Sequence, residues 1–145
     1  MPITPFTRQQ LLPQEEKLEV MKQRGELFIG LPKETSFQER RICLTPDAVS
    51  SLVAHGHRVM MESGAGLTAS YSDKEYSDAG AEITHDPKKV FGCPIVLKVE
   101  PPTIKEVEMM NQKSLLISAL QLKTQKAEYF HALETKKITA LAFEY

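Results

Sequence analysis

A charged loop near the beginning of the chain lies between two recognisable elements and carries side chains capable of binding chemistry. The apolar run Leu27–Leu31 ends at Pro32, which cannot donate a hydrogen bond within a sheet, so we expect a strand to stop there. Thr45-Pro46-Asp47 is a typical helix start. Because ligands of open α/β sheets bind at the carboxyl ends of strands, the loop between them is a candidate site. Its charged residues are Lys33, Glu34, Glu39, Arg40 and Arg41.

An arginine in this loop is suited to hold a carboxylate. The planar guanidinium presents pairs of N–H groups that match the two carboxylate oxygens, so it fixes orientation as well as charge. The alternative for Arg41 is a surface ion pair with Glu39 or Glu34 and no ligand.

Lys98 is the second candidate. It follows the apolar run Pro94–Leu97, which we expect to be a central strand buried on both faces. Lysine is seldom buried unless it is paired, so Lys98 either reaches solvent beside Glu100 or points into a polar cleft at the end of the strand.

Short β-rich runs alternate with helical patterns, and these predict the elements that position the candidate residues. The expected strands are Leu27–Leu31, Arg58–Glu62, Glu82–Thr84, Ile95–Val99, Ser114–Ala119 and Ile138–Phe143. The expected helices are Pro46–His55, Tyr71–Ala79, Thr103–Met110 and Thr124–Lys136. This alternation predicts a three-layer α/β fold, flavodoxin-like or Rossmann-like, with a mostly parallel sheet and helices on both faces.

Composition excludes several classes of function. With 18 basic and 19 acidic residues the net charge is −1, which gives no electrostatic basis for binding nucleic acid. No apolar run approaches the roughly 20 residues that cross a bilayer, and the amino terminus lacks the apolar core of a signal peptide, so we expect no membrane insertion and a cytoplasmic location. Cys43 and Cys93 lie too far apart to suggest a zinc site, and no metal is expected.

Two segments need a separate interpretation. Residues 1–26 form an amino-terminal extension, in which Gln14–Gln23 is expected to be a short helix. Gly64–Ala69 fits a relaxed dinucleotide fingerprint, but we reject that function because we expect no helix to open before Ser72, and the phosphates need a helix amino terminus within the motif.

A series of motifs, in order, resembles the opening of the alanine dehydrogenase and nicotinamide nucleotide transhydrogenase family. The motifs are Gly30-Leu31-Pro32-Lys33-Glu34, Glu39-Arg40-Arg41-Ile42, Thr45-Pro46, Gly56-His57, Glu62–Gly66, Tyr76 with Ala79-Gly80-Ala81, and Leu97-Lys98-Val99. The resemblance implies that residues 27–145 form the amino-terminal substrate domain and that an NAD-binding domain follows beyond this chain.

The resemblance also implies a reaction and roles for particular residues. It implies an oxidoreductase that uses NAD or NADP, held mainly by the following domain, to interconvert L-alanine and pyruvate. Arg41 would bind the carboxylate of this small 2-oxo or amino acid, and Lys98 would contact it and polarise its carbonyl. Lys98 and Gln121 take the catalytic positions. The full-length protein would form a homo-oligomer, and this fragment alone would be inactive.

Gln121 departs from the pattern of the resembled family. Alanine dehydrogenases typically carry a histidine in a Leu-His-Leu context, whereas this chain has Leu120-Gln121-Leu122. Glutamine donates a hydrogen bond but cannot exchange a proton near neutral pH. A glutamine here resembles the transhydrogenase α subunit, which is the alternative function. Saccharopine or lysine-ketoglutarate reductases, and a non-catalytic binding or assembly domain, are the further alternatives.

Overall fold

The computed structural model describes residues 25–144 of the chain, so the helix expected at Gln14–Gln23 lies outside the described residues. Within residues 25–144 the strands are β1 Phe28–Leu31, β2 Arg58–Glu62, β3 Glu82–Thr84, β4 Ile95–Leu97, β5 Leu115–Ser118 and β6 Thr139–Ala142. The helices are α2 Pro46–Ala54, α3 Asp73–Asp78, α4 Pro87–Phe91, α5 Ile104–Met109 and α6 Ala127–Thr135, with a 3-10 turn, η1, at Leu67–Ala69.

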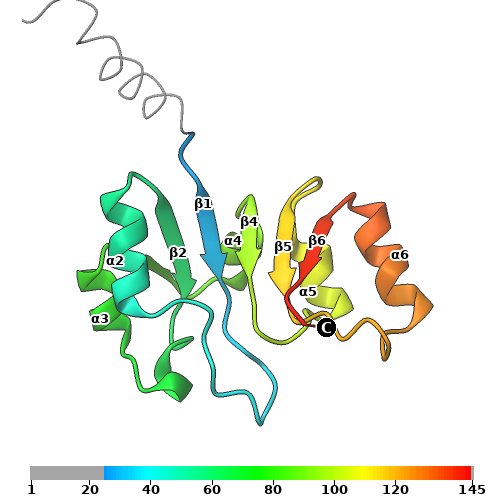
Figure 1. Ribbon diagram of the computed structural model, residues 1–145, viewed down its shortest axis with the longest axis horizontal. Helices are drawn as coiled ribbons and strands as arrows, with labels where there is room; N and C mark the ends of the chain where they lie inside the picture. Colours follow the sequence, from blue (N-terminus) through cyan, green and yellow to red (C-terminus); the bar gives the residue numbers. More distant parts are fainter. Residues whose placement is uncertain (1–24, 145) are drawn as a thin grey trace, which may run out of the picture.

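The six strands form one parallel sheet in the order β3-β2-β1-β4-β5-β6 (Figure 1). Every adjacent pair is parallel, including β1 with β2 and β1 with β4, so the sheet is wholly rather than mostly parallel. The strand order reverses direction between β1 and β4. Because the connections that leave these two neighbours run to opposite sides, their carboxyl ends form the switch point where α/β folds bind ligands.

Helices cover both faces of the sheet, which confirms the three-layer prediction. Right-handed crossovers place α2 and α3 on one face and α4, α5 and α6 on the other. In agreement, one buried cluster joins Val49 of α2 and Tyr76 of α3 to strand residues, and a second joins Phe91 of α4 and Val107 of α5 to others. Each cluster therefore fills the space between the sheet and one layer of helices.

Capping residues set several of the helix ends. Thr45 accepts a hydrogen bond from Ala48 N at the start of α2, and Pro46 occupies the first turn. Ser72 forms a capping box with Glu75, so α3 begins later than expected. Helix α6 also begins later than expected, at Ala127.

Sequence periodicity did not reveal α4. Asp86 caps it and Pro87 opens it, but five residues are too few to display an amphipathic repeat. The helix is placed by close packing on β1 at Gly30. A side-chain carbon at this position would lie 2.3 Å from the carbonyl oxygen of Val90.

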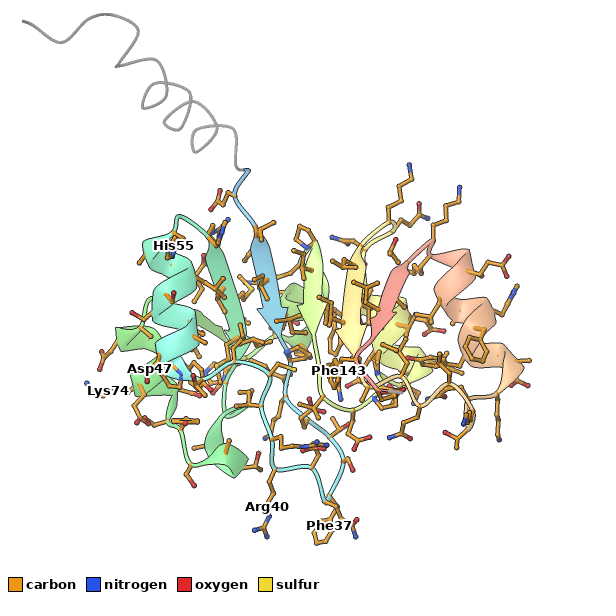
Figure 2. All side chains as sticks on the ribbon, in the orientation of Figure 1. Phe37, Arg40, Asp47, His55, Lys74 and Phe143 are labelled. Carbon is orange, nitrogen blue, oxygen red and sulfur yellow. The ribbon has the colours of Figure 1, made fainter. Side chains whose placement is uncertain are left out.

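Part of the sheet has no helical cover among the described residues. On the face that carries α2 and α3, the strands β4 to β6 are left partly open, and Leu141 and Phe143 are 51% and 52% exposed. Figure 2 shows Phe143 beyond the end of β6. In residues 25–144, no helix combines the length and apolar character needed to cross a membrane.

The packing at Gly30 leads to a stability prediction. Gly30→Ala should lower the free energy of unfolding by about 1–3 kcal/mol, because the added methyl group meets a backbone oxygen that cannot rotate away. Urea unfolding measures the change. Gly25→Ala is the control, since nothing lies within 4 Å of the added carbon, and it should change stability by less than about 0.5 kcal/mol. Equal effects of the two substitutions would contradict the packing.

Candidate functional site

The loop after β1 is tied to the end of β4 by a single carboxylate. Glu34 accepts a hydrogen bond from Val99 N at 2.6 Å and from Glu100 N at 3.3 Å. The same carboxylate accepts a hydrogen bond from Lys98 Nζ at 2.8 Å. Glu34 therefore joins the two loops that meet at the switch point of the sheet.

The ion pair between Glu34 and Lys98 is buried. The side chain of Lys98 is 1% exposed and that of Glu34 is 6% exposed. The alternative in which Lys98 is a solvated strand end is therefore wrong. Strand β4 ends at Leu97, two residues earlier than expected, so Lys98 belongs to the loop and not to the strand. Its contact with a substrate stays a prediction.

Arg41 lies closer to solvent and is held by a different carboxylate. Its Nε and Nη2 donate to Glu39 Oε1 and Oε2 at 2.9 and 2.7 Å, while the Arg41 backbone N donates to Oε1 at 2.8 Å. The Glu39 side chain is 5% exposed but that of Arg41 is 72% exposed. Figure 2 shows the neighbouring Arg40 pointing away from the sheet, at the tip of the loop beside Phe37.

The ion pair changes the acidity of both partners. Hydrogen bonding from Arg41 lowers the pKa of Glu39 from its ordinary value of 4.5 to about 2, although burial opposes this shift. Because Arg41 donates these hydrogen bonds to the Glu39 carboxylate, the pKa of Arg41 is raised in turn. Glu39 occupies the Nε–Nη2 edge of the guanidinium. A second carboxylate would therefore bind the Nη1–Nη2 edge.

Gln121 reaches the same cluster through Glu100. Its Nε2 donates to Glu100 Oε2 at 3.0 Å, and its own backbone N donates to Glu144. The backbone of Gln121 is left-handed, with φ of 50°, which turns the chain sharply after β5. The charge of Glu100 also helps to raise the pKa of Arg41.

A shallow groove of about 330 Å³ runs between the loop and the open part of the sheet. It is lined by Arg41, Ile42, Cys43, Leu97, Val99, Ile117 and Phe143. Burial raises the pKa of the Cys43 thiol to about 11. The negative charge of Glu34 raises this pKa as well, and the positive charge of Lys98 lowers it. The structure thus brings the loops of Arg41 and Lys98 together, with Arg41 on the groove and Lys98 buried beside it.

Sequence reasoning named Glu39 and Glu34 only as possible surface partners of Arg41, and it predicted neither the pairing of Glu34 with Lys98 nor the contact of Glu100 with Gln121. The available signal was the rule that a lysine closing a buried strand needs a partner. That rule asks for a carboxylate but does not choose among the three.

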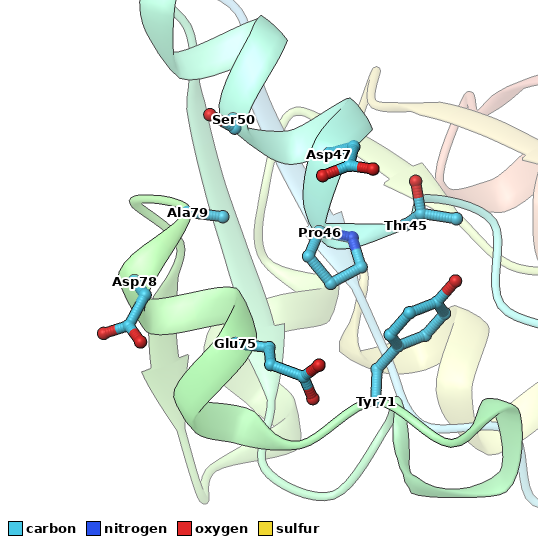
Figure 3. A pocket seen from close by; sticks show the side chains of 8 residues that line it. All are labelled: Thr45, Pro46, Asp47, Ser50, Tyr71, Glu75, Asp78 and Ala79. Atoms are coloured by element: carbon cyan, nitrogen blue, oxygen red, sulfur yellow. The ribbon is translucent and has the colours of Figure 1, made fainter.

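A larger pocket lies elsewhere, between the beginning of α2 and α3 (Figure 3). Tyr71 lines this pocket and not the groove of Arg41. Two of the pocket's acids already have partners, because Glu75 belongs to the α3 capping box and Asp78 pairs with Lys74. Among the described residues, no group of three or more histidine, cysteine or acidic side chains is placed to hold a metal ion.

The stretch Gly64–Ala69 does not form a nucleotide loop. It ends in the three-residue turn η1, and α3 begins only at Asp73 with Ser72 as its cap. Because no α-helix opens within the motif, it lacks the helix amino terminus that would face a phosphate.

Replacing Lys98 tests the buried ion pair. Lys98→Met should lower the free energy of unfolding by about 3–5 kcal/mol, because it leaves the Glu34 carboxylate buried and without its cation. The double variant with Glu34→Gln should recover part of this loss. Lys74→Met is the matched control, since its pair with Asp78 is exposed, and it should leave the stability close to that of the parent. Similar small losses in urea unfolding for both single variants would contradict the assignment.

The Glu39 ion pair predicts a dependence of stability on pH. Because the folded pKa is lowered, the ionised carboxylate stabilises the fold above about pH 4.5, and this contribution disappears as the pH falls toward 2. Glu39→Gln should therefore be less stable than the parent at pH 6, and the difference should shrink at pH 3. Urea unfolding at both pH values measures it, with the exposed helix variant Glu108→Gln as control. A difference that is constant with pH would contradict the pairing.

Comparison with known proteins identifies the family. The model of the family described as "Alanine dehydrogenase/PNT, N-terminal domain" matches residues 30–145. The alanine dehydrogenase of Bacillus subtilis (strain 168) is 41% identical over 118 residues, covering 81% of this chain and 31% of the relative. That of Methanococcus maripaludis (strain DSM 14266) is 39% identical over 119 residues, covering 81% of this chain and 32% of the relative.

Solved structures show the same relationship. An L-alanine dehydrogenase aligns with a TM-score of 0.77 and 36% identity, over 81% of this chain and 32% of its own. A transhydrogenase from Sinorhizobium meliloti aligns with a TM-score of 0.73 and 25% identity, over 79% of this chain and 34% of its own. The chain thus spans about a third of the length of these relatives. It belongs to the family of alanine dehydrogenase and PNT amino-terminal domains.

Proposed function

We propose that this chain is the substrate domain of an NAD(P)-dependent oxidoreductase that interconverts L-alanine and pyruvate. In this proposal residues 27–145 form the domain, a nucleotide-binding domain follows in a longer polypeptide, and the full-length protein is a cytoplasmic homo-oligomer. The observation that supports it best is the exposed guanidinium of Arg41, which a buried glutamate holds at the switch point of a sheet shared with alanine dehydrogenases.

Arg41 binds the carboxylate of the substrate in this proposal. Glu39 fixes the guanidinium through three hydrogen bonds and leaves the Nη1–Nη2 edge for a second carboxylate. Fixing the side chain before the ligand arrives reduces the conformational entropy lost on binding. The methyl group of alanine or pyruvate would then face the apolar wall of the groove, formed by residues such as Leu97 and Ile117.

Lys98 supplies positive charge beside the carbonyl carbon. An ammonium group has three N–H donors, and Glu34 accepts from one of them. The substrate carbonyl would accept from another. NAD, held by the following domain, would supply the hydride acceptor, and Lys98 would hydrogen-bond to the carbonyl or imine of the substrate and polarise it.

Gln121 favours a second candidate function, hydride transfer between two nicotinamides. Its amide donates to Glu100 but cannot exchange a proton with an amino acid. The similarity to a transhydrogenase supports this alternative. Two assays on the full-length protein separate the candidates: alanine-dependent reduction of NAD, and hydride exchange between NADH and an oxidised NAD analogue. Absence of both activities would favour a non-catalytic domain. Reading the residues after Tyr145 would show whether a G-x-G-x-x-G motif follows.

Arg41→Ala tests the carboxylate role in the full-length enzyme. It should lower kcat/KM for L-alanine by roughly 10- to 100-fold, the range expected when one charge-assisted hydrogen bond to the substrate is lost. Arg40→Ala is the matched control, since its side chain points away from the sheet, and steady-state kinetics of both variants measure the difference (Figure 2). Unchanged alanine turnover in Arg41→Ala would refute the role.

A further inference from the structure

We propose that Phe37 is the anchor through which the loop after β1 packs against the nucleotide-binding domain that is proposed to follow, and that this contact holds the loop in place beside the substrate. The inference rests on that part of the proposed function in which a second domain follows, and it adds a positioning residue to the site. It starts from the exposure of the Phe37 side chain, which is 101% and the highest among the exposed large apolar residues that the structure describes.

The backbone on both sides of Phe37 is held by buried carboxylates. Glu34 accepts hydrogen bonds from the end of β4, and the side chain of Glu39 is 5% exposed. Between them, Glu39 N donates to the carbonyl of Ser36 at 3.2 Å, which closes a turn with Phe37 and Gln38 at its corners. The ring therefore stands on a braced turn, and folding it back onto its own domain would break these hydrogen bonds.

The turn points toward the side on which a following domain would begin. All adjacent strands are parallel, so the loop after β1 and the chain that leaves β6 lie at the same edge of the sheet (Figure 1). Figure 2 shows Phe37 at the tip of the loop, pointing away from the sheet beyond this edge. The last described residue, Glu144, follows β6 there. A domain that continues the chain from this edge starts on the side to which Phe37 projects.

Other exposed apolar side chains gather at the same edge. Among residues 25–144, eight large apolar side chains are exposed, and five of them follow the carboxyl end of a strand. These five are Phe37, Leu67, Ile104, Leu122 and Phe143, which come after β1, β2, β4, β5 and β6. Single exposed apolar residues are normal on a protein surface, but a concentration at one edge is typical of an interaction surface.

The partner of this edge is expected in the same polypeptide. The chain spans about a third of the length of its relatives, so a large part of a longer protein is available to cover the edge. Covalent linkage gives such a domain a high effective concentration beside Phe37, which favours it over a second copy of the chain.

The contact would act on the reaction through Arg41. Arg41 lies on the same loop as Phe37, beyond the Glu39 carboxylate that holds its guanidinium. Packing the tip of the loop against a second domain restricts the backbone that carries Arg41, so less conformational entropy is lost when a substrate carboxylate binds. Phe37 itself does not contact the substrate in this proposal, and it is therefore a positioning residue.

Photo-crosslinking of the full-length protein tests the contact without depending on activity. Phe37→p-benzoylphenylalanine places a photoreactive group at the tip of the loop, and after irradiation mass spectrometry should find it joined to residues beyond Tyr145 of the same chain. Phe130→p-benzoylphenylalanine is the matched control, because Phe130 is an exposed phenylalanine on α6, and it should give no such link. A link to a second copy, no link from Phe37, or equal links from both positions would overturn the proposal.

Steady-state kinetics test the positioning role. Phe37→Ser should raise KM for L-alanine by roughly 10- to 100-fold, the range expected when the burial of one phenylalanine side chain is lost, while kcat stays near that of the parent. Phe37→Leu should retain most of the affinity, and Phe130→Ser should leave KM unchanged. An unchanged KM in Phe37→Ser would overturn the positioning role while alanine oxidation stands. A parent enzyme that fails to oxidise alanine would refute the proposed reaction, and the crosslink would still decide the contact between the domains.

Discussion

The buried ion pair between Glu34 and Lys98 is the constraint on which the candidate site depends. Removing two charges from water is costly, and only good geometry with further hydrogen bonds offsets that cost. Glu34 meets this condition because it also accepts from two backbone N–H groups at the end of β4. Compared with a pair of apolar side chains, the intact ion pair adds little net stability, although removing one partner is costly. It fixes how the loop after β1 lies against the loop after β4. Glu100 is positioned by this contact because its backbone N–H donates to Glu34, and Arg41 lies on the loop that Glu34 anchors.

The order of the strands explains why these two loops meet. Strands β1 and β4 are neighbours, although two strands and three helices separate them in the sequence. Their connections leave in opposite directions, so no covalent link joins the loops at the switch point. A non-covalent tie is needed there, and the closeness of the β1 and β4 ends makes a short one sufficient.

The fold was more accessible to sequence reasoning than the site. Short β-rich runs revealed all six strands of the described chain, and the signal was clearest for the central strands β1, β4 and β5, because a strand buried on both faces is nearly continuously apolar. They did not show that β4 ends at Leu97 or that α4 exists, since both depend on packing that no local pattern records. The sequence also did not reveal the partner of Lys98. Glu34, Glu39 and Glu100 were all available, and the path of the loop after β1 brings Glu34 to Lys98.

The pairing of Arg41 with Glu39 looks at first like the alternative in which the arginine binds no ligand. The exposed fractions of the two side chains favour a different interpretation, because Glu39 is buried while the Arg41 side chain remains 72% exposed. An arginine recruited only to neutralise a buried acid gains most when it is itself covered. In the proposed function, Glu39 fixes one edge of the guanidinium and leaves the other edge facing the groove. An arginine held in this way would be positioned for the carboxylate of a substrate before the substrate binds.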